Sequence, residues 1–285
     1  MTEPVLLAPT VLAGIDVGLS ASASADLGRL GLAERHVELA LGELTRAILV
    51  AGGRITYGGR IQEPTYTPVV IDEVRRYASR RPALTVCLAL PEHRVLSADH
   101  LEQLRRSSGV AIDLQCLDQH GEPIDPLADR GVAPEPVTDP ATCQAAYSAL
   151  RRHLTSRTDG RVLVGGQLAG FQGAMPGVVE EAISAIEAGQ PLYVAGGFGG
   201  AAAAVARTLG LDDLTWAPAD LPRFDPVDTR VTGALDRLAV AARNHGWPAV
   251  GNGLDEHENH QLAASHRPGE IASLVALGLA RHSAS

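Results

Sequence analysis

The chain has 285 residues and a formal charge of −9, and all 24 of its basic residues are arginine. Because it has no lysine, it cannot be a lysine-linked Schiff-base or PLP enzyme, and it cannot place a Walker A or kinase-type lysine on phosphates. The excess of acidic residues argues against nucleic acid or an anionic membrane as a partner. Any phosphate bound here must be held by arginine, backbone N–H groups, hydroxyls or a metal ion.

The remaining composition indicates a folded cytoplasmic protein. With 45% hydrophobic residues, a chain of this length can bury a core without disulfides. Its three cysteines have no metal-like spacing, as expected in a reducing compartment, and we expect neither a metal nor a cofactor. Residues 1–10 carry no basic residue, so we expect no signal peptide. The uncharged runs 162–179 and 189–206 are interrupted by Gly and Pro, which predicts buried strands with glycine loops rather than membrane spans.

The first predicted elements are a strand, a long helix and a second strand. An apolar run at 11–19 predicts a strand that ends in Gly18-Leu19-Ser20, followed by a segment of small polar residues. Apolar residues at helical spacing predict a helix over 32–50, which glycines at 52 and 53 end. A short strand over 54–57 then runs into Gly58-Gly59-Arg60.

The middle of the chain continues the alternation. The pattern predicts helices over 68–79 and 97–107 and strands over 83–90 and 110–117. Residues 118–140 are rich in Pro, Asp and Gly and predict an irregular connection. This connection is the best candidate for a subdomain boundary, and a long surface loop in a single domain is the alternative.

The densest signal lies in the second half. After a helix over 141–156, a strand over 161–164 leads into Gly165 and Gly166, and a glycine-spaced loop precedes a helix over 178–188. A strand over 191–194 follows, then the 196–200 glycine loop and an alanine-rich helix to Leu209; the last predicted helices cover 232–244, 255–264 and 268–280. Strands that alternate with helices predict an α/β, Rossmann-like, doubly wound and mostly parallel sheet with helices on both faces.

Glycine follows a predicted strand at four places in this chain. Without a Cβ, a ligand can approach the main-chain N–H groups, and the next helix aims its N-terminal dipole at the same point. In an open α/β sheet such loops gather at the carboxyl ends of the strands. We therefore predict a nucleotide or phospho-sugar site formed by these residues: Gly18, Ser20, Gly58, Gly59, Arg60, Gly165, Gly166, Gly196, Gly197, Phe198, Gly199 and Gly200. The dinucleotide fingerprint fits poorly, because Ala202 stands at its last glycine position.

Two of these segments carry a resemblance. Residues 50–60 (VAGGRITYGGR) and 195–203 (AGGFGGAAA) resemble the two glycine motifs of LOG-type proteins, and Gly18-Leu19-Ser20 adds to the match. The chain is thereby similar to the SLOG superfamily, which groups DprA, the LOG phosphoribohydrolases and the nucleotide-sensing domains of TRPM channels and bacterial conflict systems. The resemblance implies a single Rossmann-like domain over 1–285, in which residues 62–158 are an insertion or second lobe relative to the compact LOG form.

The departures from the LOG motif bear on activity. Gly200 replaces the motif threonine and Ala203 stands where the LOG enzymes have a glutamate that belongs to their N-glycosidic cleavage site. Alanine can neither move a proton nor stabilise an oxocarbenium ion. The resemblance therefore implies the sensing branch, with an ADP-ribose-like ligand, a link to bacterial defence, a homo-oligomer and an effector protein encoded nearby.

Individual side chains have defined expectations. We expect Arg60 to clamp a phosphate with its guanidinium, and Arg35 in the first turn of the 32–50 helix to contact the ligand; a surface position is the alternative for both. We expect Gln167 to bind a base or ribose edge, and Phe171 or Phe198 to stack on a base. Loop packing is the alternative for the two phenylalanines.

Two groups of carboxylates are candidates for catalysis or metal binding. Glu180 and Glu181 begin the 178–188 helix and complement its dipole, and Glu180 is the reserve candidate for a catalytic acid or base. The run DEHENH at 255–260 could bind a metal ion. Asp255 and Glu258, however, have the spacing of a capping box, so we favour a helix N-terminus over a metal site.

The sequence thus predicts a pocket that binds and senses a nucleotide-derived ligand. The rival hypothesis is an N-glycosidase or phosphoribohydrolase that acts on nucleoside monophosphates or NAD-related nucleotides with a carboxylate other than position 203. A third hypothesis, DprA-like binding of single-stranded DNA, is disfavoured by the negative charge.

Overall fold

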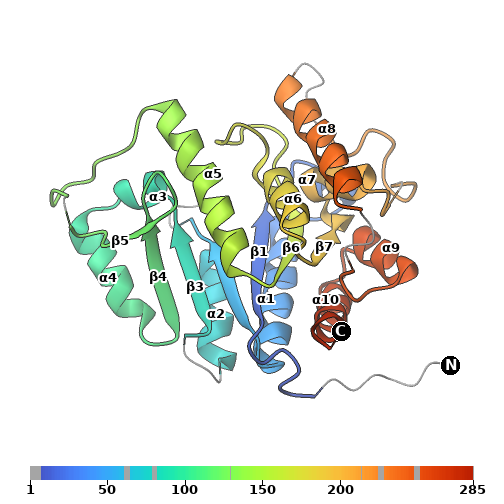
Figure 1. Cartoon of the computed structure of the whole chain (residues 1–285), viewed down its shortest axis with the longest axis horizontal. Helices are drawn as coiled ribbons and strands as arrows, with labels where there is room; N and C mark the ends of the chain where they lie inside the picture. Colours follow the sequence, from blue (N-terminus) through green and yellow to red (C-terminus); the bar gives the residue numbers. More distant parts are fainter. Residues whose placement is uncertain are drawn as a thin grey trace.

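A single seven-stranded sheet organises the chain (Figure 1). The structure is a computed structural model that describes residues 8–60, 65–78, 82–128, 130–212, 214–223, 228–246 and 251–284. The strand order is β5-β4-β3-β2-β1-β6-β7, and every neighbouring pair is parallel except β4 and β5. The strands are β1 (Asp16–Ser22), β2 (Arg54–Gly58), β3 (Leu84–Leu88), β4 (Ile112–Leu117), β5 (Pro123–Ile124), β6 (Gly160–Gly165) and β7 (Leu192–Ala195).

Helices cover both faces of the sheet. In Figure 1, α5 and α6 cross in front of the strands, whereas α1, α2 and α10 lie behind them. The described helices are α1 (Glu34–Val50), α2 (Thr67–Tyr77), α3 (Leu90–Arg94), α4 (Ala98–Ser108), α5 (Pro140–Arg157), α6 (Gly177–Glu187), α7 (Gly200–Thr208), α8 (Thr229–Asn244), α9 (Glu256–Ala264) and α10 (Pro268–Ser283). Two short 3₁₀ turns, η1 (Leu27–Leu30) and η2 (Gly196–Phe198), complete them.

Apolar side chains from the two helical layers form separate clusters. Behind the sheet, α1, α2 and α10 pack on residues such as Val17 and Ile55. On the β6–β7 side, α6, α7 and α8 share a second cluster with Leu163 and Val194. Because helices bury both faces of the central strands, these strands are protected from water on each side, as in other doubly wound sheets. The predicted fold class is therefore confirmed.

Most predicted elements are present within a few residues of their expected bounds. The first strand is the exception, because it was predicted over 11–19 and lies at Asp16–Ser22. Its last residues pair with the end of β6, where Ser20 lies opposite Leu163 and Ser22 opposite Gly165. Gly18-Leu19-Ser20 is therefore part of the strand and not a loop after it. Short α3 and β5 were not predicted, and residues 1–7, 62–64 and 79 of the predicted segments lie outside the described residues.

The middle of the chain contributes to the same sheet. Described residues between 65 and 128 supply β3, β4 and β5, and the helix α5 then returns across the front face to begin β6. A sheet position between β2 and β5 gives β3 and β4 neighbours on both sides. That residues 62–158 are an insertion or second lobe relative to compact LOG proteins stays a prediction.

A buried carboxylate joins the ends of β1 and β7. Asp26 is 1% exposed, and its Oδ2 accepts a hydrogen bond from the Gly200 N–H at 2.7 Å. The next N–H of α7, that of Ala201, donates to the Gly166 carbonyl at 3.0 Å. Gly200 has a φ of +61°, and a Cβ there would lie 2.1 Å from the Gly166 oxygen. Only glycine allows this approach, so the first turn of α7 packs against the chain itself.

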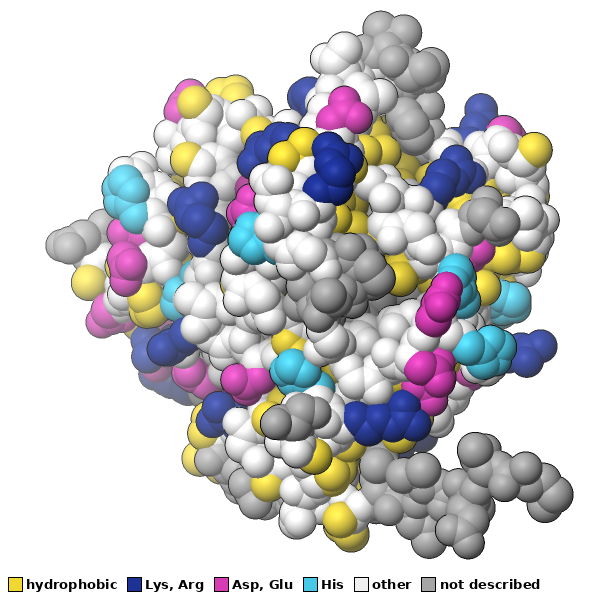
Figure 2. All heavy atoms as spheres, turned by 45° about the vertical axis from the view of Figure 1, so that its right-hand side comes forward, with side chains coloured by type: hydrophobic (Ala, Val, Ile, Leu, Met, Phe, Trp, Pro, Cys, Tyr) yellow, Lys and Arg dark blue, Asp and Glu magenta, His cyan; other side chains and the backbone are white. Residues whose placement is uncertain are grey.

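The side of the molecule formed by α8, α9 and α10 carries mixed charges. Figure 2 shows Arg, Asp, Glu and His side chains interspersed over this face. At the start of α9, the Asp255 side chain accepts from the Glu258 N–H and the Glu258 side chain accepts from the Asp255 N–H, which confirms the predicted capping box. No helix in the described part of the chain is long and apolar enough to cross a membrane.

Replacement of Asp26 by alanine tests the role of the buried carboxylate. The Asp26→Ala variant leaves the Gly200 N–H without its charged acceptor, so we expect the free energy of unfolding to fall by about 2 kcal/mol. Urea unfolding followed by circular dichroism measures this change. As a control, Asp236→Ala removes an exposed carboxylate from α8 and should change stability by less than about 0.5 kcal/mol. Equal effects of the two substitutions would contradict the assignment.

Candidate functional site

A cavity lies where the strand order of the sheet reverses. The chain places β2 on one side of β1 and β6 on the other, so the connections after β1 and β6 diverge. Ligands of open α/β sheets bind outside the carboxyl ends of the strands at such a point. Here a pocket of about 280 Å³ opens at the ends of β1, β2 and β6, with walls from α5 and α6. We call it the switch-point pocket.

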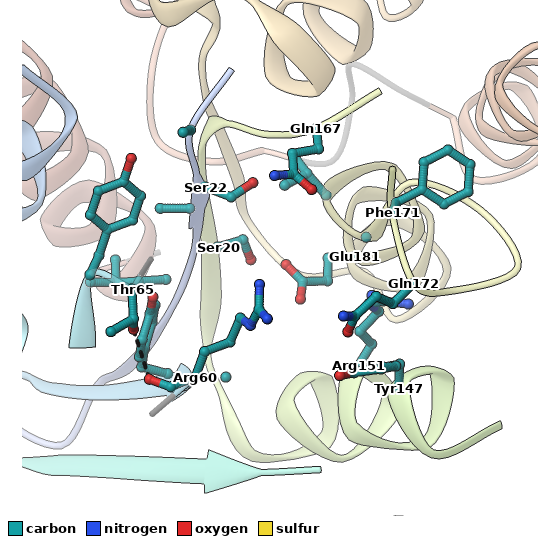
Figure 3. A pocket seen from close by; sticks show the side chains of 18 of the residues that line it. Ser20, Ser22, Arg60, Thr65, Tyr147, Arg151, Gln167, Phe171, Gln172 and Glu181 are labelled. Atoms are coloured by element: carbon teal, nitrogen blue, oxygen red, sulfur yellow. Dashed lines mark hydrogen bonds between the residues drawn. The ribbon is translucent and has the colours of Figure 1, made fainter. Parts of the chain in front are cut away.

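The carboxyl end of β1 forms the floor of this pocket. Successive side chains of a strand point to opposite faces, so Ser20 and Ser22 project to the same side, and both line the cavity. Figure 3 shows the Ser20 hydroxyl, the Arg60 guanidinium and the Glu181 carboxylate directed into one central space, with Gln167 at its edge. These side chains come from β1, the end of β2, α6 and the loop after β6. Hydroxyl, guanidinium, carboxylate and amide groups therefore converge on one small volume.

Arg60 is held by a buried carboxylate. Its Nε lies 3.4 Å from Oε1 of Glu92, and the Tyr147 hydroxyl donates to the same Oε1 at 2.6 Å. Burial and the Glu92 charge raise the pKa of Tyr147, so its hydroxyl stays protonated and keeps donating. The side chain of Arg60 is 46% exposed, compared with 7% for Glu92. Glu92 thus orients the guanidinium while its outer N–H groups remain open to the pocket.

The two carboxylates at the start of α6 have different surroundings. Glu180 forms an ion pair with Arg151 of α5, and Glu180 is not among the residues that line the pocket. Glu181, the next residue, points into the cavity and makes no ion pair with any described residue. Adjacent residues of a helix are about 100° apart around its axis, so only one of them can face the pocket. The pocket carboxylate is Glu181 rather than the reserve candidate Glu180.

The same helical geometry decides which side chains of α1 reach the pocket. Glu34 and Glu38 are four residues apart, lie on one face of the helix and line the cavity. Arg35 lies on the neighbouring face beside Leu39 and Glu43, where it borders a shallow groove between α1 and α2. The structure therefore does not bring Arg35 into the pocket and places two exposed carboxylates at its α1 side.

Most of the predicted glycines pack against the chain instead of lining the cavity. Gly58 does line it, but the Gly59 N–H donates to the Cys87 carbonyl at 3.0 Å and the Gly166 N–H to that of Ser22 at 2.9 Å. At the 196–200 loop, Asp26 and Gly166 occupy the first donors of α7. The predicted residues that lie outside the pocket lining are Gly18, Arg35, Gly59, Gly165, Gly166, Gly196, Gly197, Phe198, Gly199 and Gly200.

The two phenylalanines also differ. Phe198 is completely buried in the core behind the sheet. Phe171 borders the pocket, but Figure 3 shows its ring turned away from Ser20 and Glu181. The Arg230 guanidinium of α8 lies 4.4 Å from the centre of the Phe171 ring. One face of that ring is therefore already in a cation–π contact, which leaves only the other for a base.

Gly18 lies inside β1 because a buried arginine crosses it. Residue 161 of β6 is the register partner of Gly18, and a Cβ on Gly18 would lie 2.7 Å from Cζ of Arg161. A side chain at position 18 would displace the guanidinium, whose Nη1 donates to Oγ of Ser20 at 3.4 Å. Gly18 thus supports the floor of the pocket from below.

Comparison with known families identifies the family of the chain. The family model described as SLOG cluster2 matches residues 11–262, which is most of the chain. The chain belongs to the SLOG cluster2 family. The predicted membership in the SLOG superfamily is confirmed, and it supports a nucleotide-related function in general. A search of curated proteins finds no match.

Several residues of the switch-point pocket were not predicted from the sequence. Glu92 lies in α3, four residues after the end of β3, so its closeness to the carboxyl edge of the sheet was a usable signal. Tyr147 and Arg151 are four residues apart on α5, and the Arg151 guanidinium lies 5.9 Å from the Tyr147 ring centre. Nothing local to α5 indicates which loops it faces, because its placement depends on the long return across the sheet.

A second cavity lies on the same face at the amino ends of the strands. Its volume is about 450 Å³, and polar residues such as Asp16, Arg54, His153 and Arg157 line it. Arg54 is the first residue of β2, so it lies at this edge of the sheet, opposite to the switch-point pocket. The second cavity is larger, but it contains none of the predicted site residues and lies away from the strand ends where ligands of this fold bind. We therefore assign the functional site to the switch-point pocket.

Two glycine substitutions test the packing beneath the pocket. Gly18→Ala forces the Arg161 guanidinium out of place, so we expect a loss of about 1–3 kcal/mol in the free energy of unfolding. Gly233→Ala adds the same methyl group in α8, where a Cβ meets nothing within 4 Å. Because alanine favours helix over glycine, that variant should gain up to about 1 kcal/mol. Chemical denaturation should show changes of opposite sign, and a neutral Gly18→Ala would contradict the close contact.

Proposed function

We propose that this SLOG protein binds a phosphorylated ribonucleoside derivative, such as ADP-ribose or a cyclic relative, and acts as a sensor of it. The observation that carries the proposal is the convergence of Ser20, Arg60 and Glu181 in a pocket at the switch point of the sheet. A guanidinium and a hydroxyl suit phosphate oxygens. A carboxylate suits ribose hydroxyls, which donate hydrogen bonds to it.

The proposed contacts follow from the groups in the pocket. Arg60, oriented by Glu92, binds a phosphate through the N–H groups that face the cavity. Glu181 accepts from the ribose, and the exposed Gln167 amide binds a base edge. We do not assign phosphates to the 196–200 loop, because Asp26 already accepts from its Gly200 N–H.

Position 203 supports a binding role over hydrolysis. Ala203 is 2% exposed, and its Cα would lie 3.3 Å from a Cβ on Gly196. An alanine in this packed position offers no carboxylate to a substrate. Self-association, an effector protein encoded nearby and a role in bacterial defence are parts of the proposal that the SLOG resemblance implies. The cytoplasmic setting is proposed from the sparse cysteines.

Glu181 supports a second candidate function. An N-glycosidase needs a carboxylate near the bond between ribose C1′ and the base. In that reaction water adds its oxygen to C1′, the bond to the base breaks, and one proton of the water ends on the departing base. In this second proposal Glu181, which has no ion-pair partner among the described residues, takes the proton from water and returns it to the base.

A thermal-shift panel with AMP, NAD, ADP-ribose and cyclic ADP-ribose tests the binding proposal. A ligand at a hundredfold excess over its Kd stabilises the folded state by about 2.7 kcal/mol, so the Tm should rise by several degrees. Arg60→Ala should weaken binding about tenfold or more, because it removes a charge-assisted contact. Arg35→Ala, a matched change outside the pocket, should leave affinity within about twofold. Failure of every nucleotide to bind would reject the proposal.

Chromatography of the same mixtures separates sensing from hydrolysis. If the protein is a sensor, the nucleotide is recovered intact after long incubation with the wild-type protein. If it is a hydrolase, free base appears, and Glu181→Gln, which keeps the shape but cannot act as a base, should slow its release by about a hundredfold or more. Base release that survives Glu181→Gln would exclude Glu181 as the catalytic group.

A further inference from the structure

A buried arginine lies beneath the floor of the switch-point pocket. The Arg161 side chain is 0% exposed, and its only hydrogen bond to a described residue is the 3.4 Å contact with Oγ of Ser20. Its Nε and Nη2 have no acceptor among the described residues. Buried donors without acceptors are unfavourable, and an arginine cannot relieve the strain by losing its proton. The free protein thus holds an uncompensated cation at this place.

The carboxylates whose charges influence the pKa of Arg161 accept no hydrogen bond from its guanidinium. Burial lowers the pKa of its guanidinium, and the charges of Glu181 and then Asp16 oppose that effect. Asp16 is engaged on the other side, where Arg54 lies 3.5 Å from its Oδ2. Neither Asp16 nor Glu181 forms an ion pair with Arg161. The unmatched donors of Arg161 are therefore not explained by contacts within the described part of the chain.

Ser20 connects this buried charge to the pocket. Because a guanidinium only donates, the Ser20 oxygen is the acceptor at that contact, and its own hydrogen is left to donate elsewhere. Ser20 lines the cavity, and in Figure 3 its hydroxyl points toward the central space between Arg60 and Glu181. In a medium of low dielectric the charge behind Ser20 strengthens its interaction with a negative oxygen.

Charge varies from the rim of the pocket to its floor. Glu34 and Glu38 at the α1 side are exposed and form no ion pair with a described residue. An anionic group is repelled there, whereas at the Ser20 end Arg60 and the buried Arg161 together attract it against the opposing charge of Glu181. This gradient orients a ligand with its anion inward.

We propose that an anionic group of the ligand, a phosphate or a carboxylate, binds at Ser20, and that Arg161 is the buried positioning residue that makes this end of the pocket select an anion. The inference rests on the proposed function and specifies where the charged end of the ligand lies. Arg161 acts through Ser20 and through its charge, and it does not replace Arg60 as the direct clamp.

The experiment compares AMP with adenosine, which lacks only the phosphate, by calorimetric titration of the wild-type protein and Arg161→Met. Methionine keeps an unbranched side chain, although a shorter one, and removes the charge. We expect Arg161→Met to bind AMP about tenfold or more weakly and adenosine within about twofold of wild type. Its Tm without ligand should be equal or higher, because a buried uncompensated charge is gone. A matched loss for AMP and adenosine would show a purely structural role and overturn the inference.

Two further variants keep the test decisive. Arg157→Met removes a cation from the second cavity on the same face and should leave AMP affinity within about twofold. Ser20→Ala should weaken AMP selectively, and the double variant Ser20→Ala/Arg161→Met should be little worse than either single one, because both act on one contact. If Arg161→Met does not fold, the test is whether Ser20→Ala weakens AMP binding more than adenosine binding. An equal effect on both ligands would reject the anion site.

Inorganic phosphate separates this inference from the proposed function. If wild-type protein binds no nucleotide or nucleoside, but phosphate raises its Tm and leaves that of Ser20→Ala unchanged, then the nucleotide proposal fails and the anion site stands. If neither AMP nor phosphate binds, the anion site is rejected as well. If adenosine binds as tightly as AMP, the nucleotide pocket stands and the anion site is rejected.

Discussion

The contact between the Asp26 carboxylate and the first turn of α7 determines how the ends of three strands meet. It joins the segment after β1 to the helix after β7, and the second N–H of that helix is bound to the loop after β6. Glycine at positions 199 and 200 permits this, since any side chain would overlap Asp26 or Gly166. The helix N-terminus that a phosphate would occupy in a typical Rossmann site is thus filled by the chain's own carboxylate.

Because the N-terminus of α7 is occupied by the chain itself, the candidate site lies nearer to α5 and α6. With α7 packed against its own chain, the remaining open space at the switch point lies over Ser20, Gly58 and the start of α6. The walls of the pocket then come from α5, which reaches this place only after the chain has built the β3–β5 side of the sheet. Because the first backbone donors of α7 are occupied by the chain itself, we expect side chains rather than backbone N–H groups to contact a ligand.

The fold could be predicted from local sequence patterns, whereas the candidate site could be predicted only in part. Helices such as α1 and strands such as β2 were predicted within two residues, because periodicity and glycine stops are local signals. Five of the predicted residues line the pocket because they lie at or after the carboxyl ends of β1, β2 and β6: Ser20, Gly58, Arg60, Gln167 and Phe171. The pocket is lined by Glu181 instead of Glu180 and by Glu34 instead of Arg35. Which of two adjacent helical residues faces the pocket depends on the rotation of the helix about its axis, which the sequence leaves undetermined. Most of the glycine loops pack against the chain, and the sequence does not separate this role from ligand approach, because both select glycine for the same steric reason.

The absence of lysine gives the buried charge a particular consequence. A lysine at position 161 would shed its proton when buried and become a neutral amine, which would no longer prefer an anion. Arg161 keeps its charge whether or not the pocket is occupied, so the free protein carries the electrostatic strain permanently. In our proposal, an anion at Ser20 offsets part of that charge and thereby couples occupancy of the pocket to the stability of the central strands β1 and β6. A protein that gains stability only when its ligand is present has the physical property that a sensor needs.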